Sequence, residues 1–133
     1  MTIEDNKSIP RRFFQFVDQG NPEAAGELLG PGYVAHFPGA RLDREGHLAE
    51  ERRFMASFSE PYHAIEDQIA EDDRVATRLT FTALHTGTFR GIPPSQRRVQ
   101  TTGIQIVRIA SGKIVEWWVD YDVLGMINQL SAR

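Results

Sequence analysis

The feature that most constrains the fold is an alternation of apolar and polar residues through the second half of the chain. Three runs show it, at about 75–85, 98–109 and 113–121. Successive side chains of a β-strand point to opposite faces of a sheet, so this pattern predicts strands with one buried face. A turn at 110–113 is all that joins the last two runs, and a connection this short requires antiparallel pairing.

A fourth strand is predicted to start near His63, with residues 65–69 alternating in the same way. The acidic stretch at 71–73 then turns the chain back into the run at 75–85, which makes a hairpin. The four long strands therefore lie side by side as an antiparallel sheet.

Before the hairpin the apolar spacing is helical. Ile9, Phe13 and Val17 recur at helical intervals around Pro10, which is harmless near a helix start because its missing N–H would be unpaired there anyway. The predicted elements are a helix from Ser8 to Gly20, a helix from Asn21 to Leu29 stopped by residues 30–32, a brief strand at 33–37, a helix from Asp43 closed by Pro61, and a short apolar helix after Asp122.

These elements predict one α+β domain spanning residues 1–133. A chain of 133 residues fits a single core. The three N-terminal helices must bury their apolar stripes, and one face of the sheet offers the area they need. A strongly curved antiparallel sheet covered in this way leaves a conical space between the two layers.

Composition excludes several functional classes. The absence of cysteine excludes disulfides, thiolate catalysis and cysteine metal sites, and a net charge of −3 argues against a nucleic-acid partner. No apolar run approaches the ~20 residues that span a bilayer, so no membrane partner is expected. The N-terminus lacks the basic start and apolar stretch of a secretion signal, so we expect a cytoplasmic protein. The four histidines show no metal-ligand spacing, so no metal is expected.

Four segments carry a family resemblance. They are Tyr33-x-x-His36-x-Pro38, His85-x-Gly87-x-Phe89-x-Gly91-x-Pro93-Pro94, Gly112-Lys113-Ile114 and Asp122-x-x-Gly125-x-x-x-Gln129. Together with the order of predicted elements, they resemble the SnoaL-like polyketide cyclase or ester cyclase family of the nuclear transport factor two-like superfamily. The resemblance covers nearly the whole chain and implies a cone-shaped, barrel-like domain with a hydrophobic pocket.

The resemblance also implies what the pocket does. Members of this family are expected to need no metal and no organic cofactor, commonly to form homodimers, and to close rings of aromatic polyketides by intramolecular aldol condensation. Such a reaction needs a carboxylate that takes a proton next to a carbonyl and a donor that stabilises the enolate, inside apolar walls that exclude water. The expected partner is a small apolar ligand or substrate.

This chain departs from the family pattern at the expected acid–base position. When the turn at Gly112 is matched without gaps, the place of the family's aspartate falls on Val119. The places of the two accompanying histidines fall on Trp117 and Gln105. Valine cannot transfer a proton, so the carboxylate must come from elsewhere if the chain is an enzyme.

Alternation along the last strand divides its side chains between the two faces of the sheet. Trp117, Val119 and Tyr121 face the predicted pocket, whereas Asp120 and Asp122 face away unless a β-bulge intervenes. The predicted ligand-binding residues are largely aromatic and apolar: Tyr33, Phe37, Phe81, Gln105, Trp117, Val119 and Tyr121.

The candidate catalytic residues are Asp120 or Asp122 as base, and His36 or His85 as donor. Each has a structural interpretation as well. Asp122 precedes an apolar helix and can cap it, Asp120 can be a surface carboxylate, and His85 can brace the glycine-rich turn that it begins. For His36, which lies between apolar neighbours, the functional and structural interpretations are balanced.

The other two histidines are expected in solvent. His47 lies on a predicted helix among glutamates, and His63 begins the first long strand.

Three functional classes remain open. The preferred class is a cofactor-independent enzyme that acts on an apolar carbonyl compound by proton transfer, through cyclisation or isomerisation. A non-catalytic ligand-binding module is favoured by Val119, Trp117 and Gln105. A hydrolase would use a carboxylate to activate water. Whether Asp120 or Asp122 opens onto the cavity is the feature that discriminates between them.

Overall fold

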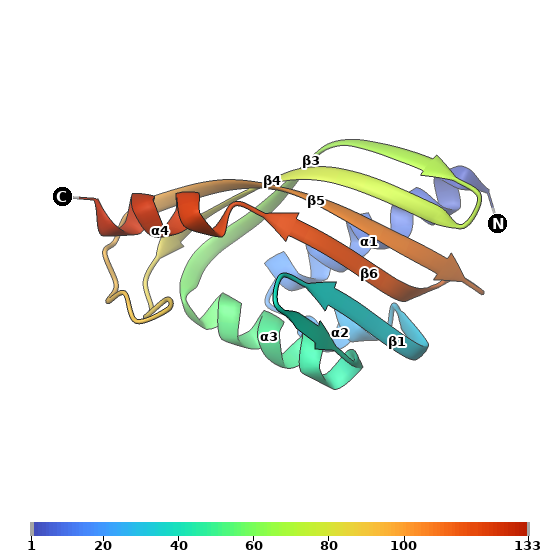
Figure 1. Ribbon diagram of the computed structural model, residues 1–133, viewed down its shortest axis with the longest axis horizontal. Helices are drawn as coiled ribbons and strands as arrows, with labels where there is room; N and C mark the ends of the chain where they lie inside the picture. The colour runs from blue at the N-terminus through green and yellow to red at the C-terminus, as the bar shows by residue number, and fades with distance from the viewer. Residues whose placement is uncertain (1, 133) are drawn as a thin grey trace.

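The computed structural model describes residues 2–132 and consists of one curved sheet with helices on its concave side (Figure 1). The helices are α1 (Ile3–Asp18), α2 (Pro22–Gly26), α3 (Arg44–Ala56) and α4 (Val123–Ser131). The strands are β1 (Leu29–Phe37), β2 (Ala40–Leu42), β3 (Phe58–Glu71), β4 (Arg74–His85), β5 (Arg98–Ala110) and β6 (Lys113–Tyr121). This arrangement confirms the predicted α+β class with three N-terminal helices and a short C-terminal helix.

The sheet has six strands in the order β2-β1-β6-β5-β4-β3. The predicted antiparallel run from β3 to β6 is confirmed, and β2 also pairs antiparallel with β1. One pairing differs from the prediction, because β1 lies parallel to β6 and makes the sheet mixed. This pairing brings Ala35 beside Trp117 and His36 beside Trp118.

Several element boundaries differ from the sequence-based prediction. Helix α2 ends at Gly26, and residues 30–32 belong to β1 instead of stopping a helix. Gly30 is needed there because a Cβ atom would lie 2.9 Å from the Cβ of Lys113 on β6. Helix α3 ends at Ala56, so Pro61 lies inside β3 and does not close the helix.

A β-bulge in β3 determines which side chains face inward. The register with β4 shifts between Ile65 and Asp67. Because of this extra residue, Ile65 packs against the core whereas Ile69 is 75% exposed, although an uninterrupted alternation would put both on one face. Before the bulge, His63 pairs with Phe81 and faces the same side as Phe81.

The core lies between the concave face of the sheet and the helices. Ile9, Phe13 and Val17 of α1 are at most 2% exposed and pack with the inward residues Val75 and Val107 of the sheet. Burial of such large apolar side chains stabilises each by about 1.5–3 kcal/mol relative to exposure. A second cluster lies at the end of the sheet that α4 covers: Phe58, Phe81, Ala83, Phe89, Val99, Met126 and Leu130.

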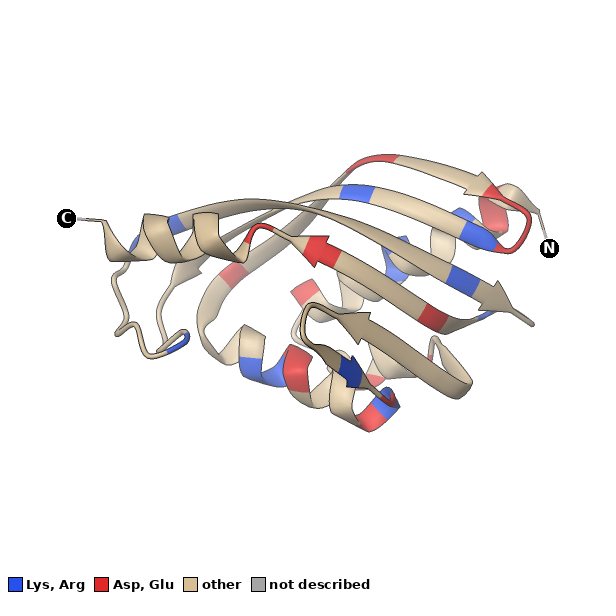
Figure 2. Ribbon diagram, in the orientation of Figure 1, with Lys and Arg blue, Asp and Glu red and all other residues tan. Residues whose placement is uncertain are grey.

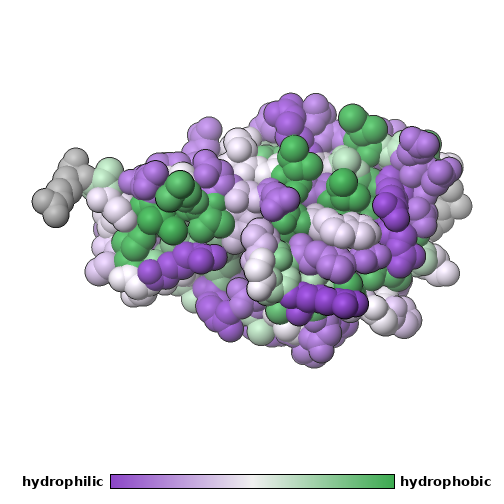
Figure 3. All heavy atoms as spheres, viewed as in Figure 1, coloured by the Kyte–Doolittle hydropathy of each residue, from purple (hydrophilic) through white to green (hydrophobic). Residues whose placement is uncertain are grey.

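The convex face of the sheet carries no helix (Figure 1). Ile104 and Ile106 are 54% and 39% exposed on it. Figure 3 shows apolar surface on this side, over the strands and over α4. Figure 2 shows acidic and basic residues interspersed along the strands and helices. Of the helices in residues 2–132, none combines the length and the apolar character that crossing a bilayer requires.

Candidate active site

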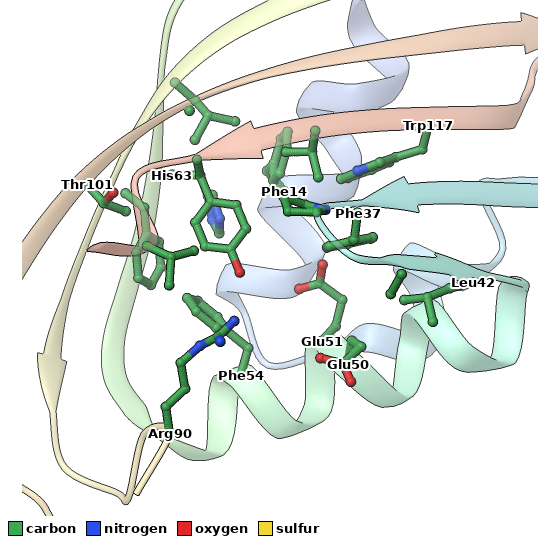
Figure 4. Close-up of a pocket in the computed structure, with 18 residues that line it drawn as sticks. Phe14, Phe37, Leu42, Glu50, Glu51, Phe54, His63, Arg90, Thr101 and Trp117 are labelled. Carbon is green, nitrogen blue, oxygen red and sulfur yellow. The ribbon is translucent and has the colours of Figure 1, made fainter. Parts of the chain in front are cut away.

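A cavity of about 280 Å³ lies between the concave face of the sheet and helices α1 and α3 (Figure 4). This volume lies near the lower end of the range for small-molecule sites. Its walls are mostly apolar. The lining residues from the helices, from β1 and β2 and from the turn between these two strands are Phe14, Phe37, Pro38, Ala40, Leu42, Glu50, Glu51 and Phe54. The other strands, α4 and the β4–β5 loop contribute His63, Leu79, Phe81, Arg90, Thr101, Gly103, Trp117, Val119, Tyr121 and Val123.

Five of the seven predicted ligand-binding residues line this cavity: Phe37, Phe81, Trp117, Val119 and Tyr121. The other two, Tyr33 and Gln105, are buried outside the lining. The Tyr33 hydroxyl bonds to a histidine behind the wall. The Gln105 amide has no hydrogen-bond partner among the described residues. A ligand-binding role for the set stays a prediction.

Asp120 and Asp122 lie outside the cavity. The pairing of β5 with β6 is regular at this end, with Ile104 opposite Asp120, so no bulge turns Asp120 inward. Both aspartates border a shallow groove on the convex face, next to Trp118. Asp122 caps α4, because its Oδ1 accepts a hydrogen bond of 2.8 Å from the backbone N–H of Gly125.

His36 also lies on the convex face. Its Nε2 lies 2.8 Å from Oε2 of Glu116, and its ring stacks on Trp118 with centroids 5.4 Å apart. Arg108 approaches the other oxygen of Glu116 at 3.4 Å. The hydrogen bond from His36 lowers the pKa of Glu116 most, burial opposes it, and Arg108 lowers it further.

His85 is fully buried at the start of the β4–β5 loop and does not line the cavity. Its Nδ1 accepts a hydrogen bond of 3.1 Å from the backbone N–H of Ser95, and the Ser95 hydroxyl lies 2.9 Å away. These contacts tie the two ends of the loop together. None of the four candidate catalytic residues therefore reaches the cavity.

The structure brings His63 to the cavity wall, so the expectation that it lies in solvent is wrong. Its side chain is 11% exposed, and its Nδ1 lies 2.6 Å from Oδ1 of Asp18, the last residue of α1. The other oxygen of Asp18 accepts the backbone N–H of His63 at 2.7 Å. The ring packs against Phe14 and Phe81, with centroids 4.7 and 4.8 Å away. Nε2 has no partner among the described residues.

His47 is fully buried, so the expectation that it lies in solvent is also wrong. Its Nε2 lies 3.0 Å from Oε1 of Glu51, one turn later on α3, and its Nδ1 lies 2.7 Å from the hydroxyl of Tyr33 on β1. Burial raises the pKa of the Tyr33 hydroxyl far above its usual range, and the charge of Glu51 raises it further.

Glu51 presents its carboxylate to the cavity with 15% of its side chain exposed. Figure 4 shows this carboxylate pointing from α3 toward the side of the cavity where Phe14 and His63 lie. Glu50 pairs with Arg53, and the Arg90 guanidinium lies 5.7 Å from the ring of Phe89. Among residues 2–132, no cluster of three or more His, Asp or Glu side chains could hold a metal ion.

Sequence reasoning did not place His47, Glu51 and His63 in or behind the cavity wall, although the sequence contains weak indications of their positions. His47 and Glu51 are four residues apart, so they share one face of the helix, and Leu48 beside them is buried. His63 lies two residues before Ile65, which packs against the core, so alternation places both on the inner face of β3. Its partner Asp18 ends α1, and no local pattern links the two residues.

The fold and the cavity define an α+β protein with a largely apolar cavity that is lined by a half-buried carboxylate and a histidine. A family model described as SnoaL-like polyketide cyclase matches residues 7–130. The chain belongs to this family.

Solved structures of similar fold agree with this assignment. IdmH of Streptomyces antibioticus, described as a candidate polyketide cyclase, is 28% identical with a TM-score of 0.85 over 96% of this chain and 99% of its own. TsrD of Streptomyces laurentii is 27% identical with a TM-score of 0.88, covering 100% and 99%. AclR of Streptomyces galilaeus, described as a candidate hydroxylase, shares the fold at 21% identity, with a TM-score of 0.91 over 99% and 84%. Among curated proteins, none matches this chain.

The pair formed by His36 and Glu116 generates a pH-dependent contribution to stability. The pKa of Glu116 is lower in the folded chain than in the unfolded one, so its ionised form stabilises the fold above the unfolded pKa. This stabilisation is lost as the pH falls through the lowered pKa. We predict that Glu116→Gln lowers the free energy of unfolding by up to about 1 kcal/mol near neutral pH and that the difference shrinks in acid.

Urea denaturation of wild type and Glu116→Gln at several pH values measures this effect. The exposed Glu71, at the β3–β4 hairpin, supplies the control variant Glu71→Gln, whose stability should follow wild type. A destabilisation by Glu116→Gln that stays constant down to acid pH would contradict the assignment.

Proposed function

We propose that this protein is an acid–base enzyme that acts on a small apolar carbonyl compound, with Glu51 as base and His63 as hydrogen-bond donor. The observation that carries this proposal is that both side chains line one largely apolar cavity and each is held by a hydrogen-bonding partner, Glu51 by the buried His47 and His63 by the half-buried Asp18. The family reaction requires a carboxylate and a donor inside a dry site. Glu51 and His63 are the residues that supply this combination.

In the proposed step, a Glu51 oxygen takes the proton from the carbon next to the substrate carbonyl. The electron pair of the C–H bond forms the carbon–carbon double bond of the enolate, and the carbonyl π pair moves onto oxygen. Asp18 accepts a hydrogen bond from Nδ1–H of His63 and so orients the ring, and in the doubly protonated form that this step requires Nε2–H donates to the enolate oxygen. The enolate carbon then attacks a second carbonyl of the same molecule, whose π pair moves onto oxygen and takes back the proton held by Glu51. In an isomerisation, a conjugated enolate takes this proton back at another carbon.

Neither step needs a metal ion or an organic cofactor, because a carboxylate moves the proton and hydrogen bonding holds the developing charge. The enzyme therefore belongs to the cyclisation or isomerisation class. The aromatic walls formed by Phe14, Phe54, Phe81 and Trp117 suit a flat or compact apolar substrate.

The carboxylate on α3 takes the place that the family gives to an aspartate on the last strand. Val119 occupies that position here and lines the same cavity as Glu51. The base therefore approaches the substrate from the helical side instead of the sheet. We expect the reacting carbon to lie toward α3 and the carbonyl oxygen toward His63.

Enolisation can be tested without the natural substrate. We expect wild type to catalyse deuterium incorporation from D₂O next to the carbonyl of small apolar ketones, followed by NMR. Glu51→Gln and His63→Gln should each lower this rate by about 100-fold, the usual loss when a general acid or base is removed. Asp120→Asn should leave the rate unchanged, because Asp120 lies on the convex face.

The opposite result is informative. If Asp120→Asn abolished exchange while Glu51→Gln and His63→Gln remained active, the catalytic group would lie outside the cavity and the proposal would be wrong. Circular dichroism of each variant checks that the substitutions leave the fold intact.

A non-catalytic ligand-binding module is the second candidate, and Val119 together with the outward position of Asp120 and Asp122 favours it. Under that alternative, apolar ketones bind in the cavity but wild type exchanges no proton. Hydrolysis would use Glu51 to activate water, and incorporation of ¹⁸O from labelled water into the product identifies it.

We also propose that a second copy of the chain covers the convex face, as expected for a homodimer. Ile104 and Ile106 are exposed there beside Trp118, and association would remove this apolar surface from water. Sedimentation should give twice the chain mass of 15.1 kDa for wild type, and Ile106→Arg should shift it toward one chain. Ile3→Lys, on α1, is the control. A monomeric wild type would contradict the proposal.

A further inference from the structure

We propose that Tyr33 and His47 form a buried relay that positions Glu51 and keeps it as a base. This inference rests on the proposed function, because it explains how the catalytic carboxylate is held. His47 does not line the cavity, so we assign it and Tyr33 as positioning residues and not as catalytic residues.

The relay has a defined direction. The hydroxyl of Tyr33 lies 2.7 Å from Nδ1 of His47, and Nε2 of His47 lies 3.0 Å from Oε1 of Glu51. Burial keeps Tyr33 protonated, because it raises the pKa of the hydroxyl far above the usual range. A carboxylate that acts as a base can only accept hydrogen bonds, so Nε2 of His47 carries the proton that bonds to Glu51; Nδ1 of a neutral ring is then an acceptor, and the Tyr33 hydroxyl donates to it.

Packing prevents the ring from leaving this arrangement. The His47 ring is fully buried among Phe13, Phe37 and Trp117, with centroids 5.5, 5.0 and 4.6 Å away. Because Oε1 of Glu51 is occupied by the His47 N–H, Oε2 is the oxygen left for the substrate proton. The relay thus sets both the orientation and the reacting atom of the base.

Removing the Tyr33 hydroxyl should disturb the base without touching the substrate. In Tyr33→Phe the imidazole can take the other tautomer and present a lone pair to Glu51, which disfavours the ionised carboxylate. We expect kcat for proton exchange to fall about 10-fold with KM nearly unchanged, as for other groups that orient a catalytic residue from behind it. Tyr62→Phe is the matched control, because Tyr62 is 60% exposed.

Nitrogen NMR of the histidine rings gives a readout that does not depend on activity. We expect His47 of wild type to carry its proton on Nε2, and Tyr33→Phe to shift population toward the Nδ1 tautomer. A wild-type ring protonated on Nδ1 alone would overturn the relay, and so would an unchanged kcat in folded Tyr33→Phe.

Two substitutions of His47 separate positioning from simple packing. The amide nitrogen of a glutamine reaches roughly the place of Nε2 and can donate to Glu51, whereas asparagine can only replace the Nδ1 contact with Tyr33. We therefore expect His47→Gln to retain more kcat than His47→Asn at comparable folding. Equal loss in both variants would indicate a packing role and contradict the relay.

The design also separates failure of the relay from failure of the proposed function. If Glu51→Gln is inactive but Tyr33→Phe behaves as wild type, the relay is wrong and Glu51 remains the base. If Glu51→Gln is fully active, the proposed function itself fails, whatever the tautomer of His47.

Discussion

A polar side chain inside an apolar wall is costly unless it is hydrogen-bonded, and this constraint organises the cavity. Two histidines lie in or behind the wall, and each has a carboxylate partner: Asp18 for His63 and Glu51 for His47. The two pairs differ in which member reaches the ligand space. In one pair the imidazole lines the cavity and the carboxylate orients it, and in the other the roles are reversed. The cavity therefore presents one imidazole and one carboxylate, each held by a similar contact.

Under the proposed function, Glu51 supplies the carboxylate that the family is expected to carry at the position of Val119. The fold supplies the same curved sheet and apolar hollow, but several elements border the hollow and any of them can contribute a carboxylate. Here α3 contributes Glu51 to the lining of the cavity, and β6 contributes only apolar and aromatic side chains. Family membership determines the fold and its cavity. The chemistry depends on which of the elements that line the cavity carry the ionisable side chains.

Alternation and turn chemistry were enough to predict the sheet from β3 to β6, the helix caps Asn21, Asp43 and Asp122, and the inward position of Trp117, Val119 and Tyr121. Those features are local or follow from a period of two. The start of α1 was predicted at Ser8, whereas the helix begins at Ile3 and contains Pro10 in its interior. The parallel pairing of β1 with β6 could not be read in this way, because it joins segments that are distant in sequence. The bulge after Ile65 and the contact of His63 with Asp18 likewise depend on tertiary packing, so the sequence placed His63 in solvent and did not show that Asp120 and Asp122 lie on the convex face.

The most direct test of this account is a crystal structure of the protein with a small phenol, whose oxygen mimics that of an enolate. The account predicts the phenol ring inside the cavity, with its oxygen in hydrogen-bonding distance of Nε2 of His63 and its ring edge toward Glu51. A phenol bound only on the convex face beside Trp118, or one in the cavity with its oxygen away from both residues, would contradict it.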